Sequence, residues 1–250
     1  MPIWSDDPAG MAEQVQAIVA RGVRTPRPFR RQLADLWAAL GPGVLFWGQW
    51  EAVATALLAS GTVAGLGVML VRDDPTLGQV VVVALAPLLL LTLSGFVEAL
   101  DRGGPLGDLR RTCRWSAARI TGFRMLCFTA AGALFALPLA GWTGRGLAGE
   151  DAVRLLLWAL LSVAVAALVQ LVLLDRTSGW RAVLAFPLVW LVGWAVLLRT
   201  APRAVVAVLQ GVPVLLPAGL LVVAGWGIGW TVRGLFASAA MRRSFGVAGQ

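Results

Sequence analysis

The side chains best placed to do chemistry in this chain lie between Glu98 and Met125, in the stretch EALDRGGPLGDLRRTCRWSAARITGFRM. This stretch separates two of the most apolar runs of the sequence, VVVALAPLLLLTLSGF and LCFTAAGALFALPLAG. Its apolar residues recur at spacings of three and four, which predicts a short amphipathic helix with arginines on the other faces. The apolar positions are Leu106, Leu109, Cys113, Ala117 and Ile120, and the arginines are Arg110, Arg111 and Arg114. This pattern favours binding to a surface over bond-making chemistry.

Two surfaces fit such a helix. Arginines that follow an apolar run can bind lipid phosphates and fix the orientation of a membrane protein, and then the helix needs no other partner. Alternatively, the apolar edge fits a groove on a cytosolic protein, and the arginines meet its acidic rim. The sequence leaves both interpretations open.

Several kinds of catalysis are excluded by residue types that the chain lacks. It contains no lysine, so it has no Walker A loop, whose lysine contacts the phosphates of ATP. It contains no histidine, which excludes histidine general bases and histidine metal ligands. We expect Cys113 and Cys127 to be packing residues and not a disulfide. The chain is therefore predicted to be no enzyme, to hold no cofactor or metal, and to bind no nucleic acid.

Polar residues inside the apolar segments are few, and three of them are candidates for a pathway or a gate. Gln49 and Glu51 enter the first apolar segment, and Gln170 lies in the fourth. A carboxylate near the bilayer is costly enough to indicate a function. However, Glu51 is close to a predicted membrane boundary, where snorkelling or pairing with an arginine explains it equally well. Gln170 is explained equally well by a hydrogen bond to a neighbouring helix.

Composition places all these residues in a membrane protein. The chain is 58% hydrophobic and 14% charged, which is too little polar surface for a soluble globule. Hydropathy predicts an all-α integral membrane protein with six transmembrane helices, because a span needs about 20 apolar residues. The predicted spans are residues 44–71, 78–100, 119–140, 153–174, 180–198 and 213–232.

The arginines predict how these spans are oriented. An even number of spans puts both termini on one side, and sixteen of the 21 basic residues fall on that side. By the positive-inside rule both termini are cytoplasmic, in a bacterial-type inner (cell) membrane. The domains are then a cytoplasmic segment over residues 1–43, a six-span domain over 44–232 and a cytoplasmic tail over 233–250. The arginines predicted to lie outside are Arg72, Arg145, Arg154, Arg199 and Arg203.

Two segments outside the spans are also predicted to be ordered. The stretch RRQLADLWAAL has the pattern of an amphipathic helix at the inner interface, and we expect it to end at the breaker Gly41–Pro42–Gly43. The stretch TAPRAVVAVLQGVP before the last span is apolar but too short to cross, which predicts a shallow or re-entrant outer segment.

The loop and the layout together resemble the permease subunits of type-2 ABC exporters. Those permeases have an interface helix, six spans and a coupling helix between spans two and three, with a pattern like E-R-E-x-G-T-L-E-x-L-L-x-x-P-V-S-R-x-x-I-x-x-G-K. Here Ser116, Ile120 and Arg124 match without gaps, whereas Arg114, Ala117 and Phe123 replace the proline, the arginine and the glycine. The positions that the resemblance assigns to the coupling loop are Glu98, Asp101, Leu106, Asp108, Leu109, Arg110, Arg111, Cys113, Arg114, Ser116, Ile120 and Arg124.

The resemblance implies a transport subunit that docks a separate cytosolic ATPase, which binds the ATP. It also implies a homodimer, or a heterodimer with a similar permease, with subunit contacts at span one. Gly61 and Gly65 would allow close approach of helices there. The alternative is a non-transporting membrane regulator or scaffold, whose same loop binds a signalling protein such as an anti-sigma factor. No transported substrate follows from the sequence.

Overall fold

The structure is a computed structural model that describes residues 28–46, 50–70, 74–103, 117–176 and 180–245. Within these ranges the chain is almost entirely helical and contains no strand, so the predicted all-α class is confirmed. The chain divides into two compact units, Met1–Val44 and Leu45–Gln250, which are described separately.

The described part of the first unit belongs to the helix α2, Phe29–Phe46. The amphipathic helix is therefore present, but the prediction that it ends at Gly41–Gly43 is wrong, because α2 continues to Phe46. Pro42 removes one backbone donor and costs about 3 kcal/mol relative to alanine in a helix interior. A helix that ended there would instead leave its last four carbonyl groups without an intrahelical donor.

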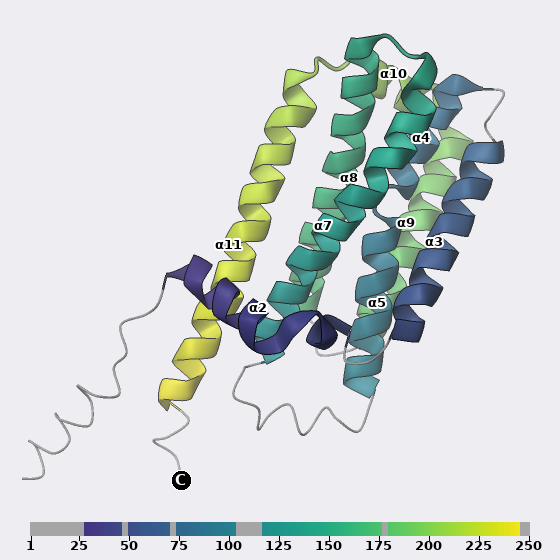
Figure 1. Cartoon of the computed structure of the whole chain (residues 1–250). Coiled ribbons are helices and arrows are strands. Elements are labelled where there is room, and N and C mark those ends of the chain that lie inside the picture. Colours follow the sequence, from purple (N-terminus) through teal and green to yellow (C-terminus); the bar gives the residue numbers. More distant parts are fainter. Residues whose placement is uncertain (1–27, 47–49, 71–73, 104–116, 177–179, 246–250) are drawn as a thin grey trace, which may run out of the picture. The chain divides into compact units, whose positions relative to one another are not determined.

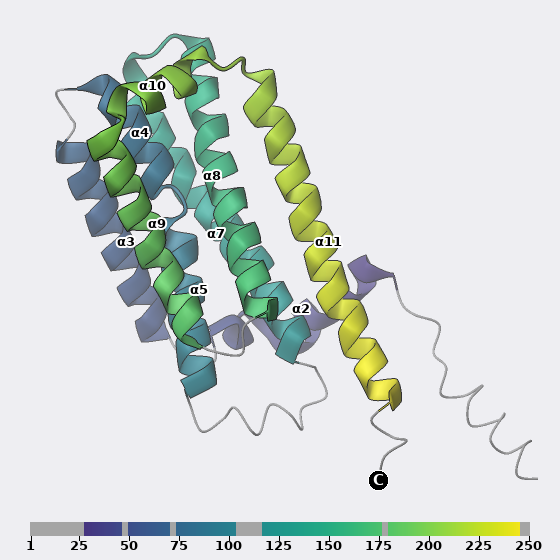
Figure 2. The same ribbon diagram turned by 180° about the vertical axis from the view of Figure 1, so that it is seen from behind.

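The second unit is a bundle of helices that run side by side (Figure 1, Figure 2). The short helix α10 lies across the end of this bundle that is uppermost in both views, and a 3₁₀ turn, η2, connects α7 to α8. The elements are α3 (Trp50–Leu70), α4 (Pro75–Leu85), α5 (Leu88–Gly103), α7 (Ala117–Thr143), η2 (Gly144–Gly146), α8 (Gly149–Arg176), α9 (Trp180–Thr200), α10 (Pro202–Gly211) and α11 (Leu215–Phe245).

Four helical segments are long and apolar enough to cross a membrane, and a fifth counts if α9 and α10 are one bent span. Between α9 and α10 the chain bends by 99°, so the short segment predicted before the last span is a separate 10-residue helix. The described apolar stretch of α3, Val53–Gly67, is shorter than 18 residues. A multi-pass membrane class is thus supported, while six spans stay a prediction. The four crossing segments are Thr76–Glu98, Arg119–Thr143, Gly149–Arg176 and Leu215–Ala237.

The segment Thr76–Glu98, which comprises α4 and most of α5, forms the centre of the bundle. In its most apolar window 83% of the residues are buried, against 22% for Leu215–Ala237 in α11. This segment also has the highest mean hydropathy of the four crossing segments. α3, α7, α8 and α9 all contact it, and the Ser60 and Thr92 hydroxyls, 2.9 Å apart, join α3 to α5.

The central segment is broken between α4 and α5. Pro87 has no N–H group, so the Val83 carbonyl loses the donor that a continuous helix would supply. Ser162 Oγ on α8 donates to the Val83 oxygen at 2.7 Å, and Trp190 Nε1 on α9 donates to the Ala84 oxygen at 2.9 Å. Side chains from two neighbouring helices therefore satisfy the backbone at the break.

The start of α4 is fixed by a capping carboxylate. Asp74 Oδ1 accepts hydrogen bonds from the Thr76 hydroxyl at 2.6 Å and from the backbone N–H groups of Thr76 and Leu77 at 3.0 and 3.2 Å. These bonds, above all the one from the Thr76 hydroxyl, hold the pKa of the Asp74 carboxyl below its ordinary value. The cap therefore stays ionised at neutral pH, where its charge complements the positive end of the helix.

The close contact of α7 with the central segment gives a first prediction. A Cβ atom at Gly132 would lie 3.0 Å from the Leu90 Cβ and 3.3 Å from Val163 Cγ1, whereas one at Gly141 on the same helix would meet nothing within 4 Å. We expect Gly132→Leu to cost about 1–3 kcal/mol through overpacking. Gly141→Leu should leave the thermal unfolding midpoint in detergent unchanged. Equal midpoints for the two variants would contradict the contact.

The hydrogen bonds at the break give a second prediction, for two buried serines. Ser162→Ala should destabilise the protein by about 1–3 kcal/mol, because the Val83 carbonyl would be buried without a donor. Ser94→Ala is the matched control, because Ser94 Oγ donates at 3.2 Å to the Leu91 carbonyl inside α5, where the helix itself supplies donors. Unfolding in detergent followed by circular dichroism measures both. A Ser94 variant as unstable as the Ser162 variant would refute this account of the break.

Candidate functional site

Most of the predicted coupling loop lies outside the described residues. Residues 104–116 contain Leu106, Asp108, Leu109, Arg110, Arg111, Cys113, Arg114 and Ser116, and the side chain of Asp101 at the end of α5 is also not described. The amphipathic helix in this loop stays a prediction. The helices on either side of the loop are described, and they show how it is attached.

The helices on both sides of the loop, α5 and α7, form polar contacts with neighbouring helices. Glu98 in α5 is 6% exposed, and its Oε1 accepts a hydrogen bond of 3.1 Å from the Thr121 hydroxyl in α7. Arg119 in α7 donates from Nη2 to the Phe236 carbonyl of α11 at 3.3 Å, and its guanidinium lies 5.9 Å from the Phe236 ring centre. These contacts join the last turns of α5 to the first turns of α7, and they join α7 to α11.

Three predicted loop residues lie inside the bundle and not on its surface. Glu98, Ile120 and Arg124 are all buried, and Arg124 is only 1% exposed. Their side chains are thus part of the bundle beside the loop, and their role in coupling stays a prediction. Buried charged groups of this kind are retained only where hydrogen bonds or charges compensate them.

The three candidates for a pathway lie in different settings. Gln49 is outside the described residues, and Glu51 is exposed in the first turn of α3. Gln170 is fully buried in α8, and neither its amide nitrogen nor its amide oxygen has a hydrogen-bond partner among the described residues. Burying an amide without hydrogen-bond partners costs about 1–3 kcal/mol of stability. Gln170 therefore stays a candidate for a pathway or a gate.

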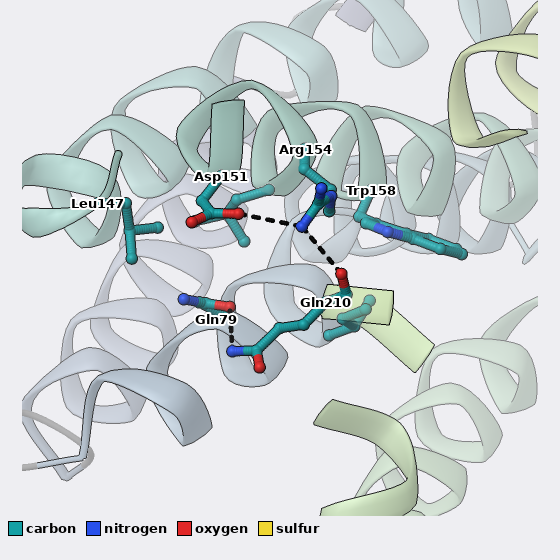
Figure 3. A pocket seen from close by; sticks show the side chains of 8 residues that line it. Gln79, Leu147, Asp151, Arg154, Trp158 and Gln210 are labelled. Carbon is teal, nitrogen blue, oxygen red and sulfur yellow. Dashed lines mark hydrogen bonds and ion pairs between the residues drawn. The ribbon is translucent and has the colours of Figure 1, made fainter. Parts of the chain in front are cut away.

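A polar pocket, which sequence analysis did not predict, lies at the opposite end of the bundle from the end of α5 and the start of α7. It has a volume of about 220 Å³ and lies where α4, α8 and α10 meet (Figure 3). Gln79 comes from α4, Arg154 and Trp158 come from α8, and Gln210 comes from α10. The lining is completed by Leu147, Asp151, Leu155 and Leu209.

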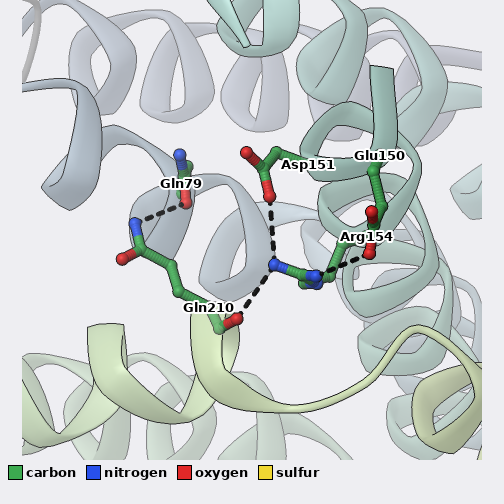
Figure 4. A network of polar contacts seen from close by, with 5 residues as sticks. All are labelled: Gln79, Glu150, Asp151, Arg154 and Gln210. Atoms are coloured by element: carbon green, nitrogen blue, oxygen red, sulfur yellow. Dashed lines mark hydrogen bonds and ion pairs between the residues drawn. The ribbon is translucent and has the colours of Figure 1, made fainter. Parts of the chain in front are cut away.

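Arg154 organises this pocket. Its side chain is 16% exposed, with Nη2 3.0 Å from Glu150 Oε1 and Nη1 3.0 Å from Asp151 Oδ1. Nη1 also donates to the Gln210 carbonyl at 2.9 Å, which supplies a donor to the last turn of α10 (Figure 4). Gln79 and Gln210 face each other across the pocket, with their side-chain oxygen and nitrogen 3.5 Å apart.

Two buried donors at the pocket are left without a partner. Trp158 Nε1 and Arg154 Nε have no hydrogen-bond partner among the described residues. Buried N–H groups are nearly always bonded, so these two donors require a partner such as water or a ligand. Within the described ranges no three His, Cys, Asp or Glu residues are grouped in a way that could hold a metal. The pocket is equipped for binding by hydrogen bonds.

An apolar groove adjoins the polar pocket. Its volume is about 450 Å³, and it shares Trp158 and Leu209 with the pocket. Its wall includes both donors at the helix break, Ser162 and Trp190. Phe186, Trp190 and Trp194 form a row along α9, with consecutive ring centres 6.1 and 6.3 Å apart. Further lining residues are Val83, Val165, Ala204, Val205 and Val208.

Only the part of this site that lies on α8 can be predicted from the sequence. Glu150, Asp151, Arg154 and Trp158 follow one another at helical spacing, so their proximity on α8 can be read from the sequence. Gln79 and Gln210 are 131 residues apart, and only the bend between α9 and α10 brings them together.

Known proteins add no assignment for this site. Comparison with protein-family models, with curated proteins and with solved structures finds no match for the chain. Its function is therefore argued from the attachment of the loop and from the shape and polarity of the cavities.

Proposed function

We propose that this chain is the membrane-spanning permease subunit of an ABC exporter and that it docks a separate ATPase through the loop after α5. The observation that supports this most is the attachment of that loop. A loop transmits movement from a cytosolic partner only if its ends are fixed in the bundle. The Glu98–Thr121 and Arg119–Phe236 hydrogen bonds provide such fixed ends on α5, α7 and α11.

Through α5, the loop is connected to the centre of the bundle. α5 precedes the loop directly and continues the most buried segment of the bundle, which is broken at Pro87. Movement of the loop would therefore be transmitted through α5 to the break at Pro87 in the central segment. A multi-span regulator that binds a signalling protein would use the same attachment, so the two functions differ in the identity of the partner.

The proposed dimer surface has room for a partner. At Gly61 and Gly65 an added Cβ atom would meet nothing within 4 Å, so these faces of α3 make no close contact with the described chain. Leu58, Leu66 and Met69 are exposed on the same helix. Such a surface suits either lipid or a second permease, and subunit contact at α3 stays a prediction.

The orientation is tested at the two ends of α8, which is one of the crossing helices. Gly149→Cys and Asp175→Cys place single thiols at exposed positions in its first and last turns, in a background with Cys113 and Cys127 replaced by alanine. The positive-inside rule predicts that a membrane-impermeant maleimide added to intact cells labels Cys at 149 only. Labelling at 175 only would reverse the orientation and remove the loop from the cytoplasm.

Docking of an ATPase is tested by one change on the apolar face of the loop. Leu109→Asp places a charge in the predicted contact and should abolish ATPase binding, at a cost of several kcal/mol. Gly107→Asp adds the same charge on the opposite face of the predicted helix and is the matched control. Membranes from the native host are solubilised, and the ATP hydrolysis that co-purifies with each variant is measured.

A triple variant separates docking from simple lipid anchoring. If the loop only binds lipid, replacing Arg110, Arg111 and Arg114 by glutamine should impair membrane insertion, at about 1 kcal/mol for each arginine. In that case Leu109→Asp should have no effect on the co-purifying ATPase. A Leu109→Asp variant that inserts and keeps its ATPase refutes the permease proposal. Loss of a co-purifying protein that lacks ATPase activity supports the regulator.

A further inference from the structure

The apolar groove and the polar pocket lie next to each other. They share Trp158 and Leu209, and their volumes are about 450 and 220 Å³. Cavities of about 300–1,000 Å³ are typical of small-molecule sites. Together they form a site that is apolar in its larger part and polar at one end, which is the division found in an amphiphile.

We infer that this site binds one zwitterionic phospholipid, with an acyl chain in the groove and the head group in the pocket. The inference goes beyond the proposed function, because it requires neither an ATPase nor transport. It rests on three features of the described residues: the access to the groove, the unpartnered donors and the local charge.

The groove is accessible from the apolar surface of the bundle. Val165, Leu197 and Val208 line it from α8, α9 and α10, and all three are exposed. Ser162 and Trp190, two of its side chains that can form hydrogen bonds, are already bonded to the backbone at the break. The surface that the groove offers to a chain is almost entirely apolar, and covering it is favourable by about 25 cal/mol per Å².

The pocket offers donors to a phosphate and an acceptor to an ammonium group. Trp158 Nε1 and Arg154 Nε are the two buried donors without partners. Asp151 also lines the pocket, and its side chain is half-exposed. A phosphodiester could accept from the two donors while a neighbouring ammonium group meets the Asp151 carboxylate.

The local charge selects against an anionic head group. The positive charge of Arg154 is already paired with two carboxylates, those of Glu150 and Asp151. A phosphate alone would meet this excess of negative charge, whereas the ammonium group of a zwitterionic lipid offsets it. A head group with no net charge is therefore favoured over an anionic one.

Occupancy of the groove is tested by photo-crosslinking in lipid nanodiscs. The probe is a phosphatidylethanolamine with a diazirine in its acyl chain, and mass spectrometry locates the labelled peptides. We expect labelling of α9 and α10, and its loss in Ala204→Trp, which fills the groove. Ala207→Trp is the matched control, because Ala207 is exposed on the same helix but does not line the groove.

Three outcomes would overturn occupancy by a lipid chain. The first is unchanged labelling of α9 and α10 in Ala204→Trp. The second is equal loss in the two tryptophan variants, which would indicate damage to α10 and not filling of the groove. The third is crosslinking of this face to a second copy of the chain in place of the lipid.

The head group is tested with an anionic probe, phosphatidylglycerol, that carries the same acyl chain. We expect phosphatidylethanolamine to label about two to five times more strongly, as an exposed carboxylate–ammonium pair allows. Asp151→Asn should remove this preference. Glu150→Gln, which also loses a carboxylate bound to Arg154 but lies outside the pocket lining, should retain most of it. Equal labelling by the two lipids in the unaltered protein refutes the head-group assignment.

Discussion

The hydrogen bonds of the backbone in an apolar environment are the constraint on which this structure depends. The central segment of the bundle is broken at Pro87, where a continuous helix would have paired its own carbonyl groups. Ser162 on α8 and Trp190 on α9 complete the pairing at Val83 and Ala84. Two neighbouring helices therefore satisfy the backbone at the break, and these hydrogen bonds join α8 and α9 to the central segment.

The same segment connects the two polar regions of the bundle. At the beginning of α4, Gln79 faces the pocket that Arg154 organises, and near the end of α5, Glu98 anchors the loop. The groove lies along the break between them and includes both of its donors. A molecule bound in the groove and a protein bound at the loop would thus both act on the central segment. The first would act at the break at Pro87, and the second would act at the end of α5.

Two arginines at opposite ends of the bundle bond to groups on neighbouring helices. Arg154 bonds to two carboxylates and to the carbonyl of Gln210, and Arg119 bonds to the carbonyl of Phe236. Arg154 supplies a donor to the last turn of α10, which has no donors of its own, whereas Arg119 bonds to a carbonyl group within α11. Arg154 thus joins α8 to α10, and Arg119 joins α7 to α11.

The sequence by itself determined the helical class, the positions of the long apolar helices and the short helix before α11, because these depend on composition and segment length. The tertiary structure decided the rest. Pro42 and Pro87 are both breakers in sequence, yet α2 runs through the first and the central segment breaks at the second. At Pro87, side chains of α8 and α9 supply donors to the backbone, which allows the break. Gln79 meets Gln210, and Ser162 meets Val83, only in the folded bundle, because contacts between distant segments have no local pattern in the sequence.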